Sequence, residues 1–236
     1  MNNKISSLIL AILLVVIFWG SASNYFILMA AVALLVIAVS AVNLKRVSYS
    51  WPHLLLPVLF LLAAGGIFAI LTSPQSRLWF LLLAGIIFYL IETNLGKEGY
   101  LLQTVFLLSS FALYVGLFSL HFYLRLNPGL LAVLSFFLTG LLAITGFAGF
   151  SQPAKKYFIL LIAAVCAEIT LALAYWPTYF MVNAVILFCI FYLLWIFAVS
   201  AFFGKLTKEK IFLQLTMIGL VLIIVLSTAT WTPLFK

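Results

Sequence analysis

Nine long apolar stretches, separated by short loops, occupy almost all of this 236-residue chain. A helix of roughly 20 apolar residues is long enough to cross the hydrocarbon core of a bilayer, which is about 30 Å thick. Hydrophobic residues make up 67% of the chain and charged residues 7%, so too few polar side chains are present to cover a water-soluble surface. The sequence therefore predicts an all-α, polytopic membrane bundle that forms a single transmembrane domain over residues 1–236, with no soluble domain.

The prolines mark the boundaries of the predicted spans. By hydropathy the nine spans cover residues 5–20, 24–43, 54–72, 78–93, 101–124, 130–150, 157–176, 178–203 and 211–231. Only Pro57 lies inside a span, in its first turn, where its missing N–H has no intrahelical partner and no kink is required. The apolar run 8–19, followed by Ser21-Ala22-Ser23, also resembles a cleavable signal peptide, and its removal would leave eight spans.

The basic residues predict an orientation, because Lys and Arg are retained on the cytoplasmic side of a membrane. With nine alternating spans, most basic residues fall on the side of the N-terminus. These are Lys4, Lys45, Arg46, Lys97, Lys155, Lys156, Lys205, Lys208 and Lys210, against Arg77, Arg125 and Lys236 on the other side. We therefore expect a cytoplasmic N-terminus and an outside C-terminus in a cell membrane, namely the cytoplasmic membrane of a bacterium or archaeon.

The formal net charge of +8 comes from these loops and tails, so we interpret it as a topological signal and expect no nucleic-acid partner. Near anionic lipid headgroups each basic side chain contributes about 1 kcal/mol of attraction. The residues expected to contact headgroups are Lys45, Arg46, Lys155, Lys156, Lys205, Lys208 and Lys210. Membrane lipids, and other membrane subunits, are the partners that this composition permits.

Glu168 is the most costly polar residue in the predicted spans. It lies eight residues from the outer end of the seventh span, about 12 Å below that surface by helix rise. A carboxylate at that depth costs about 2.5 kcal/mol or more, so we expect it to be protonated, paired or facing water. Ala164 and Ala172 lie one turn away on either side, and small residues favour a helix–helix contact. We therefore expect Glu168 to face another helix rather than lipid.

Further polar residues are predicted at similar depth on the fifth, seventh and eighth spans. On the fifth span, Gln103, Ser110, Tyr114 and His121 are spaced so that they share one helix face. In the outer half of the membrane we expect Glu168, Tyr114, His121, Tyr175, Tyr179 and Asn183. We predict that these six residues line an outward-facing polar pocket, where they bind a substrate or couple protons.

A structural interpretation competes with this pocket, because intramembrane hydroxyl and amide groups often only cross-link helices, at about 0.6 kcal/mol per bond. For Glu168 both interpretations stay open. An inner part of a transport path would involve Glu92, at the end of the fourth span, and Gln214 at similar depth on the ninth. Together with Ser110 and Gln103, these two residues are secondary candidates.

The small number of aspartate and histidine residues limits the metal sites and hydrolytic mechanisms that the chain can support. It contains no aspartate, and its two histidines, His53 and His121, fall on opposite sides of the predicted topology. We therefore expect no metal and no cofactor, and we assign no catalytic residue.

Three function classes remain. The first is handling or transport of a small molecule, ion or lipid through the outer pocket, and the second is a non-catalytic scaffold or subunit of a larger membrane complex. The third is an enzyme acting on a lipid-linked substrate, with Glu168 as general base and Arg125 near the phosphate. We favour the first class and regard an enzymatic activity as the less expected outcome.

Overall fold

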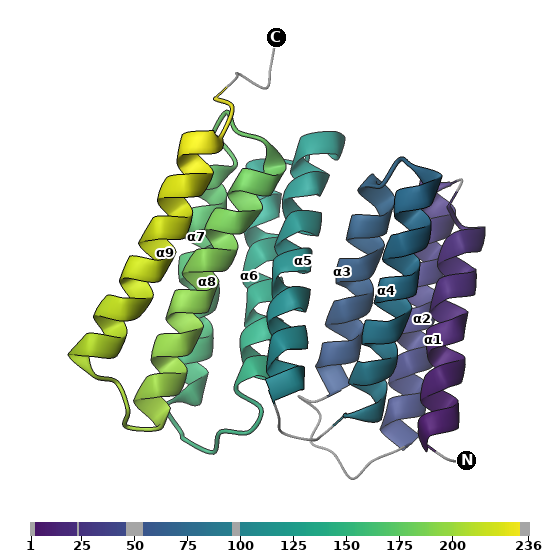
Figure 1. Ribbon diagram of the computed structural model, residues 1–236, viewed down its shortest axis with the longest axis horizontal. Coiled ribbons are helices and arrows are strands. Elements are labelled where there is room, and N and C mark those ends of the chain that lie inside the picture. The colour runs from purple at the N-terminus through teal and green to yellow at the C-terminus, as the bar shows by residue number, and fades with distance from the viewer. Residues whose placement is uncertain (1–2, 23, 46–53, 96–99, 232–236) are drawn as a thin grey trace. The chain divides into compact units, whose positions relative to one another are not determined.

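The structure is a computed structural model that describes residues 3–22, 24–45, 54–95 and 100–231. Within these ranges the chain forms nine helices and no strand, which confirms the all-helical prediction (Figure 1). They are α1 (Asn3–Gly20), α2 (Tyr25–Lys45), α3 (Leu55–Ile70), α4 (Pro74–Thr93), α5 (Tyr100–Leu124), α6 (Pro128–Gly146), α7 (Lys155–Leu173), α8 (Phe180–Phe202) and α9 (Lys208–Thr228). Seven of them are long and apolar enough to cross a membrane, and α1 and α3 have shorter apolar segments.

Several helices begin earlier than their predicted spans, and for α4 and α6 a proline explains the earlier start. Pro74 and Pro128 stand at the first position of α4 and α6. A proline is favourable there because its fixed φ already suits a helix and its missing N–H has no intrahelical partner. At the start of α6, the side chain of Asn127 also accepts a hydrogen bond from the backbone N–H of Gly129, at 2.8 Å. Pro57 lies in the first turn of α3, as predicted.

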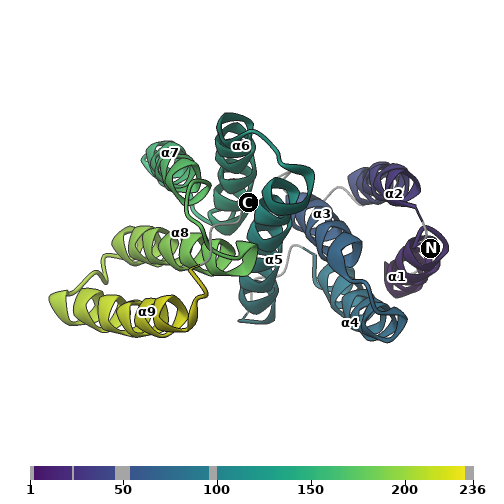
Figure 2. The same cartoon turned by 90° about the horizontal axis from the view of Figure 1, so that it is seen from above.

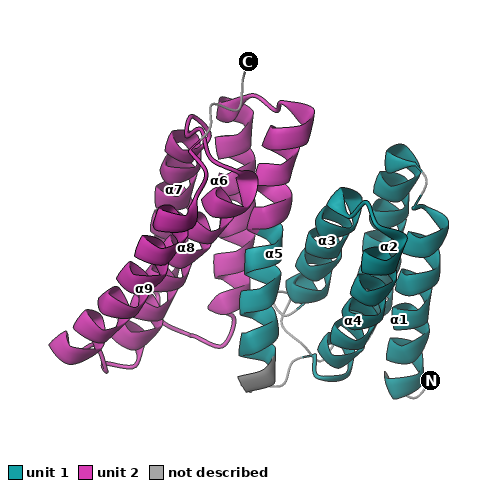
Figure 3. Cartoon of the chain, turned by 45° about the horizontal axis from the view of Figure 1, so that its top comes forward, with its two compact units in different colours: residues 1–113 teal, residues 114–236 magenta. Residues whose placement is uncertain are grey.

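The helices form two compact units, residues 1–113 and 114–236, and the boundary falls within α5 (Figure 3). In unit 1, α1 packs on α2, α2 on α3, α3 on α4 and α4 on α1, so these four helices close a ring (Figure 2). Glycines permit the close approach: a Cβ at Gly65 would lie 2.7 Å from Val32 Cγ2, and one at Gly85 2.9 Å from Val15 Cγ2. Small residues at such contacts are typical of membrane helix pairs.

In unit 2, α6 packs along α7, α7 on α8 and α8 on α9. A buried hydrogen bond of 2.7 Å joins the hydroxyls of Ser135 on α6 and Thr170 on α7. The helix α9 is mostly exposed, and Ile218 is its one buried residue.

The outward faces of both units carry large apolar side chains. Phe26 on α2 is 81% exposed and Phe212 on α9 is 74% exposed. In water such a surface would aggregate, whereas in lipid it meets a matching environment. The chain is a multi-pass membrane protein by the length, composition and outward-facing surface of its helices.

Candidate functional site

Tyr114 is fully buried in unit 2. Its hydroxyl lies 3.0 Å from the hydroxyl of Thr139 on α6, and its ring meets the ring of Phe191 on α8 edge-on, with centroids 5.8 Å apart. The side chain is 0% exposed, so no open cavity reaches it. Tyr114 therefore ties α5 to α6 and α8.

Asn183 is also buried, and both of its side-chain polar atoms make local hydrogen bonds. Its amide N–H donates to the backbone carbonyl of Leu173 at 3.1 Å, and its side-chain oxygen accepts from the hydroxyl of Thr178 at 2.7 Å. These bonds join the first turn of α8 to the end of α7 and to the turn between them.

His121 joins two loop carbonyls in unit 2. Its Nδ1 lies 2.7 Å from the backbone oxygen of Leu126, and its Nε2 lies 3.1 Å from that of Ala174. A neutral imidazole has one N–H and satisfies one of these carbonyls, whereas a ring with two protons satisfies both. This geometry places His121 between the end of α5 and the end of α7.

Tyr175 and Tyr179 lie on the surface, at 73% and 43% exposure. Tyr179 packs in an aromatic cluster with Phe122 and Phe180, at ring centroid distances of 5.3 and 4.2 Å. The six residues predicted to share one outward pocket therefore have different surroundings: Tyr114 and Asn183 are buried within the protein, His121 is half-buried, and the others are exposed.

Glu168 does not face a neighbouring helix of unit 2, in contrast to the expectation from its alanine neighbours. It is exposed, and it lies on the side of α7 opposite the buried residues. Those buried residues are Ile162, Ala163, Cys166, Thr170 and Leu173. Because α7 has small residues on both faces, the sequence did not distinguish them, and within unit 2 the face that packs on α6 is the one with Ala163 and Cys166.

The secondary candidates are also dispersed. Ser110 is buried and donates to the carbonyl of Phe106 within its own helix, at 2.8 Å. Gln103 on α5 is exposed, and Gln214 on α9 is half-buried. Gln103 belongs to unit 1 and Gln214 to unit 2.

Glu92 has a partner that the sequence analysis did not predict. It is 3% exposed, and its carboxylate Oε1 accepts a hydrogen bond of 2.8 Å from the amide of Asn43, which is 1% exposed. The pair joins the last turn of α4 to the last turn of α2. Asn43 Oδ1 has no hydrogen-bond partner among the described residues. This buried hydrogen bond lies at the end of unit 1 that we expect to face the cytosol.

The basic residues expected at the headgroups are mostly exposed. Lys45, Lys156, Lys205, Lys208 and Lys210 are exposed, and Arg46 lies outside the described residues. Lys155 differs, because it is half-buried and its ammonium donates to the carbonyl of Phe150 at 2.9 Å. Lys155 therefore closes the loop before α7, whereas Lys156 is available to a ligand.

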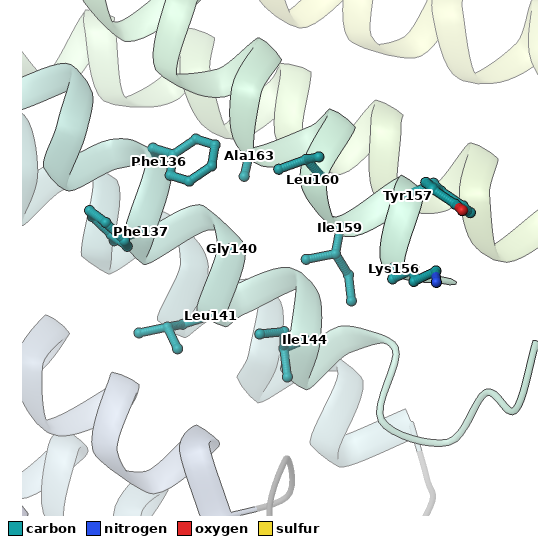
Figure 4. A pocket seen from close by; sticks show the side chains of 10 residues that line it. All are labelled: Phe136, Phe137, Gly140, Leu141, Ile144, Lys156, Tyr157, Ile159, Leu160 and Ala163. Atoms are coloured by element: carbon teal, nitrogen blue, oxygen red, sulfur yellow. The ribbon is translucent and has the colours of Figure 1, made fainter. Parts of the chain in front are cut away.

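An apolar groove of about 590 Å³ lies between α6 and α7 (Figure 4). Side chains from α6 line one side and side chains from the first half of α7 the other. The lining residues are Phe136, Phe137, Gly140, Leu141, Ile144, Lys156, Tyr157, Ile159, Leu160 and Ala163. This volume and this mostly apolar lining are typical of a small-molecule site.

The polar groups of the groove stand at one end. Lys156 and Tyr157 lie together at that end, and Phe136 and Phe137 at the other (Figure 4). The Lys156 ammonium lies 5.2 Å from the centroid of the Tyr157 ring, within the range of a cation–π contact. In the middle, a Cβ at Gly140 would lie 3.8 Å from the Ala163 Cβ, so small residues at this point keep the groove open.

No family model, curated protein or solved structure matches the chain.

The sequence analysis missed both the groove and the Asn43–Glu92 pair. For the groove, the available signal was a cation directly before an aromatic residue at the start of a span, Lys156-Tyr157. For the pair, the signal was that Asn43 and Glu92 both stand at the inner ends of their spans. Neither signal identifies the partner helix, because that depends on how each helix is rotated.

Proposed function

We propose that this multi-pass membrane protein handles lipid, and that it binds an anionic lipid in the groove between α6 and α7. The observation that carries the proposal is the position of one exposed cation, Lys156, at the end of a mostly apolar groove. An acyl chain fits the apolar part, and a phosphate headgroup fits the ammonium. The setting we propose is the cytoplasmic membrane of a bacterium or archaeon.

The depth of the groove supports this assignment. Lys156 lies in the first turn of α7, and Ala163 lies seven residues further along, about 10 Å by helix rise. The groove thus begins where headgroups lie and extends toward the bilayer centre. A lipid oriented with its phosphate at the helix end has its chain along this path, whereas a polar solute would leave the apolar part unfilled.

Buried polar residues in unit 2 favour this function over transport through an outer pocket. Tyr114 and Asn183 are occupied by bonds to protein groups, so they are better suited to joining helices than to binding a moving solute. Lipid binding in the groove would not require any of these hydrogen bonds to break.

The experiment measures thermal protection of the purified protein in a neutral detergent by phosphatidylglycerol, with phosphatidylcholine for comparison. A ligand at 100 times its Kd stabilises the folded state by about 2.7 kcal/mol. Gly140→Phe fills the groove, and Lys156→Gln removes its cation. Lys210→Gln removes an exposed cation of α9 and is the matched control.

We expect Gly140→Phe to abolish protection by both lipids. Lys156→Gln should remove the preference for the anionic lipid, about 1 kcal/mol or roughly fivefold in affinity. Lys210→Gln should leave that preference unchanged. If Lys156→Gln and Lys210→Gln behave alike and Gly140→Phe is still protected, the groove does not bind lipid.

A further inference from the structure

Glu168 is an acid on the exposed apolar face of a helix. It is exposed on the side of α7 that unit 2 leaves uncovered. On the same side lie Leu161 at 54% exposure and Leu171 at 40% exposure. An ionisable side chain among such residues meets acyl chains unless another helix covers it, and that exposure is energetically unfavourable.

The depth of Glu168 prevents it from reaching headgroups. It lies five residues before the end of α7 at Leu173 and thirteen after its start at Lys155, about 7.5 and 20 Å by helix rise. Long Lys and Arg side chains reach the interface from such positions by extension, but a glutamate side chain is shorter. The carboxyl therefore needs a hydrogen-bonding partner within the membrane.

The immediate surroundings suit a close helix contact. Ala164 and Ala172 stand one turn before and one turn after Glu168 on the same side of α7. The two alanines are eight residues apart, with Glu168 midway between them, and small residues on one side of a helix let a second helix approach closely. A carboxyl between them is then shielded from lipid by the second helix.

We propose that this face binds the same face of a second copy of the chain, about a two-fold axis normal to the membrane. Such an axis places each residue at the same depth in both copies, so Glu168 meets Glu168 of the second copy. A carboxyl group can both donate and accept a hydrogen bond, and one shared proton satisfies the pair without a cation. The sequence supports this pairing, because its predicted spans contain no Lys or Arg that could be the partner of the Glu168 carboxyl instead.

This interface is independent of the proposed lipid site. The groove residues of α7 run from Lys156 to Ala163, and Glu168 lies five residues beyond them. Loss of dimerisation and loss of lipid protection are therefore separate outcomes, measured on separate variants.

The first test measures dimerisation of the full chain in liposomes by fluorescence energy transfer between labelled copies, as lipid is added. Glu168→Leu should weaken the dimer about tenfold, because it removes the only acid of this face. Glu168→Gln should retain most of the affinity, because an amide also donates and accepts. Glu209→Leu, at the exposed start of α9, is the matched control and should leave the affinity unchanged.

The second test maps the face by disulfide cross-linking in a Cys166→Ala, Cys189→Ala background. Ala172→Cys should give a covalent dimer on oxidation, whereas Ile223→Cys, on the exposed surface of α9, should not. The proposal is overturned if the wild type is monomeric at high protein-to-lipid ratio, if Glu168→Leu dimerises like the wild type, or if cross-links form through α9 and not α7. Because these outcomes do not all depend on Glu168→Leu, poor folding of that variant leaves the proposal testable.

Discussion

Removing the amide of Asn43 should destabilise unit 1 through the carboxylate that it binds. The two side chains are 1% and 3% exposed, and the Asn43 Nδ2 to Glu92 Oε1 distance is 2.8 Å. A hydrogen bond to a charged group contributes about 1.5–3 kcal/mol. We therefore expect Asn43→Leu to lower the free energy of unfolding by about 2–3 kcal/mol.

A double-mutant cycle isolates this bond from the other contacts of either residue. The cycle compares the wild type, Asn43→Leu, Glu92→Leu and the double variant, and it cancels contributions made to other neighbours. We expect a coupling energy of about 1.5–3 kcal/mol, with the double variant less unstable than the sum of the single variants. Glu92→Gln keeps an acceptor without charge, so in its cycle with Asn43→Leu the coupling should fall to about 0.5–1.5 kcal/mol.

The assay is equilibrium unfolding in mixed detergent micelles, followed by tryptophan fluorescence, to which Trp19 and Trp79 of unit 1 contribute. A coupling energy below about 0.5 kcal/mol would refute the reasoning, since it would mean that the bond is exchanged for water at no cost. Equal coupling for Glu92→Leu and Glu92→Gln would refute the claim that the carboxylate is charged.

Two further stability predictions follow from contacts in each unit. Tyr114→Phe should lower the free energy of unfolding by about 0.6 kcal/mol, and by at most about 1.7 kcal/mol. Adding Thr139→Val to this variant should lower it little further, which a double-mutant cycle in mixed micelles checks. If the losses of the two single variants add in full, the bond between the two hydroxyls is excluded. Gly65→Ala places a methyl carbon 2.7 Å from Val32 Cγ2, so overpacking should cost about 1–3 kcal/mol. Gly219→Ala, with no atom near its Cβ, should be neutral or stabilising, and equal melting temperatures for these two variants would contradict the packing.

Most polar groups in the helices are used within the protein. Ser109, Ser110 and Thr145 donate to the carbonyl four residues earlier in their own helix, and Ser135 and Thr170 bond to each other. Such bonds remove the cost of a polar group in lipid and supply no free site. These hydroxyls therefore serve the structure of the helices and their packing. The residues that remain as functional candidates are Glu168 and those of the groove with Lys156.

The sequence by itself determined the number of helices, their approximate ends and the membrane setting. Lipid cannot hydrogen-bond to the backbone, so any long apolar segment must form a helix that satisfies its own N–H and C=O groups. Hydropathy and the prolines therefore sufficed, as the agreement between the span predicted at 101–124 and α5 at Tyr100–Leu124 shows. The same constraint located Pro57 in a first turn without any knowledge of the fold.

Only the tertiary structure decided which side of each helix faces protein. Lipid chains are as apolar as leucine, so the packed and lipid-facing sides of a span carry similar residues and hydropathy does not distinguish them. For that reason Ala164 and Ala172 suggested a buried Glu168 that the structure places on the surface. The bond between Asn43 and Glu92, and the groove beside Lys156, likewise depend on helix rotations that arise only when neighbouring helices pack.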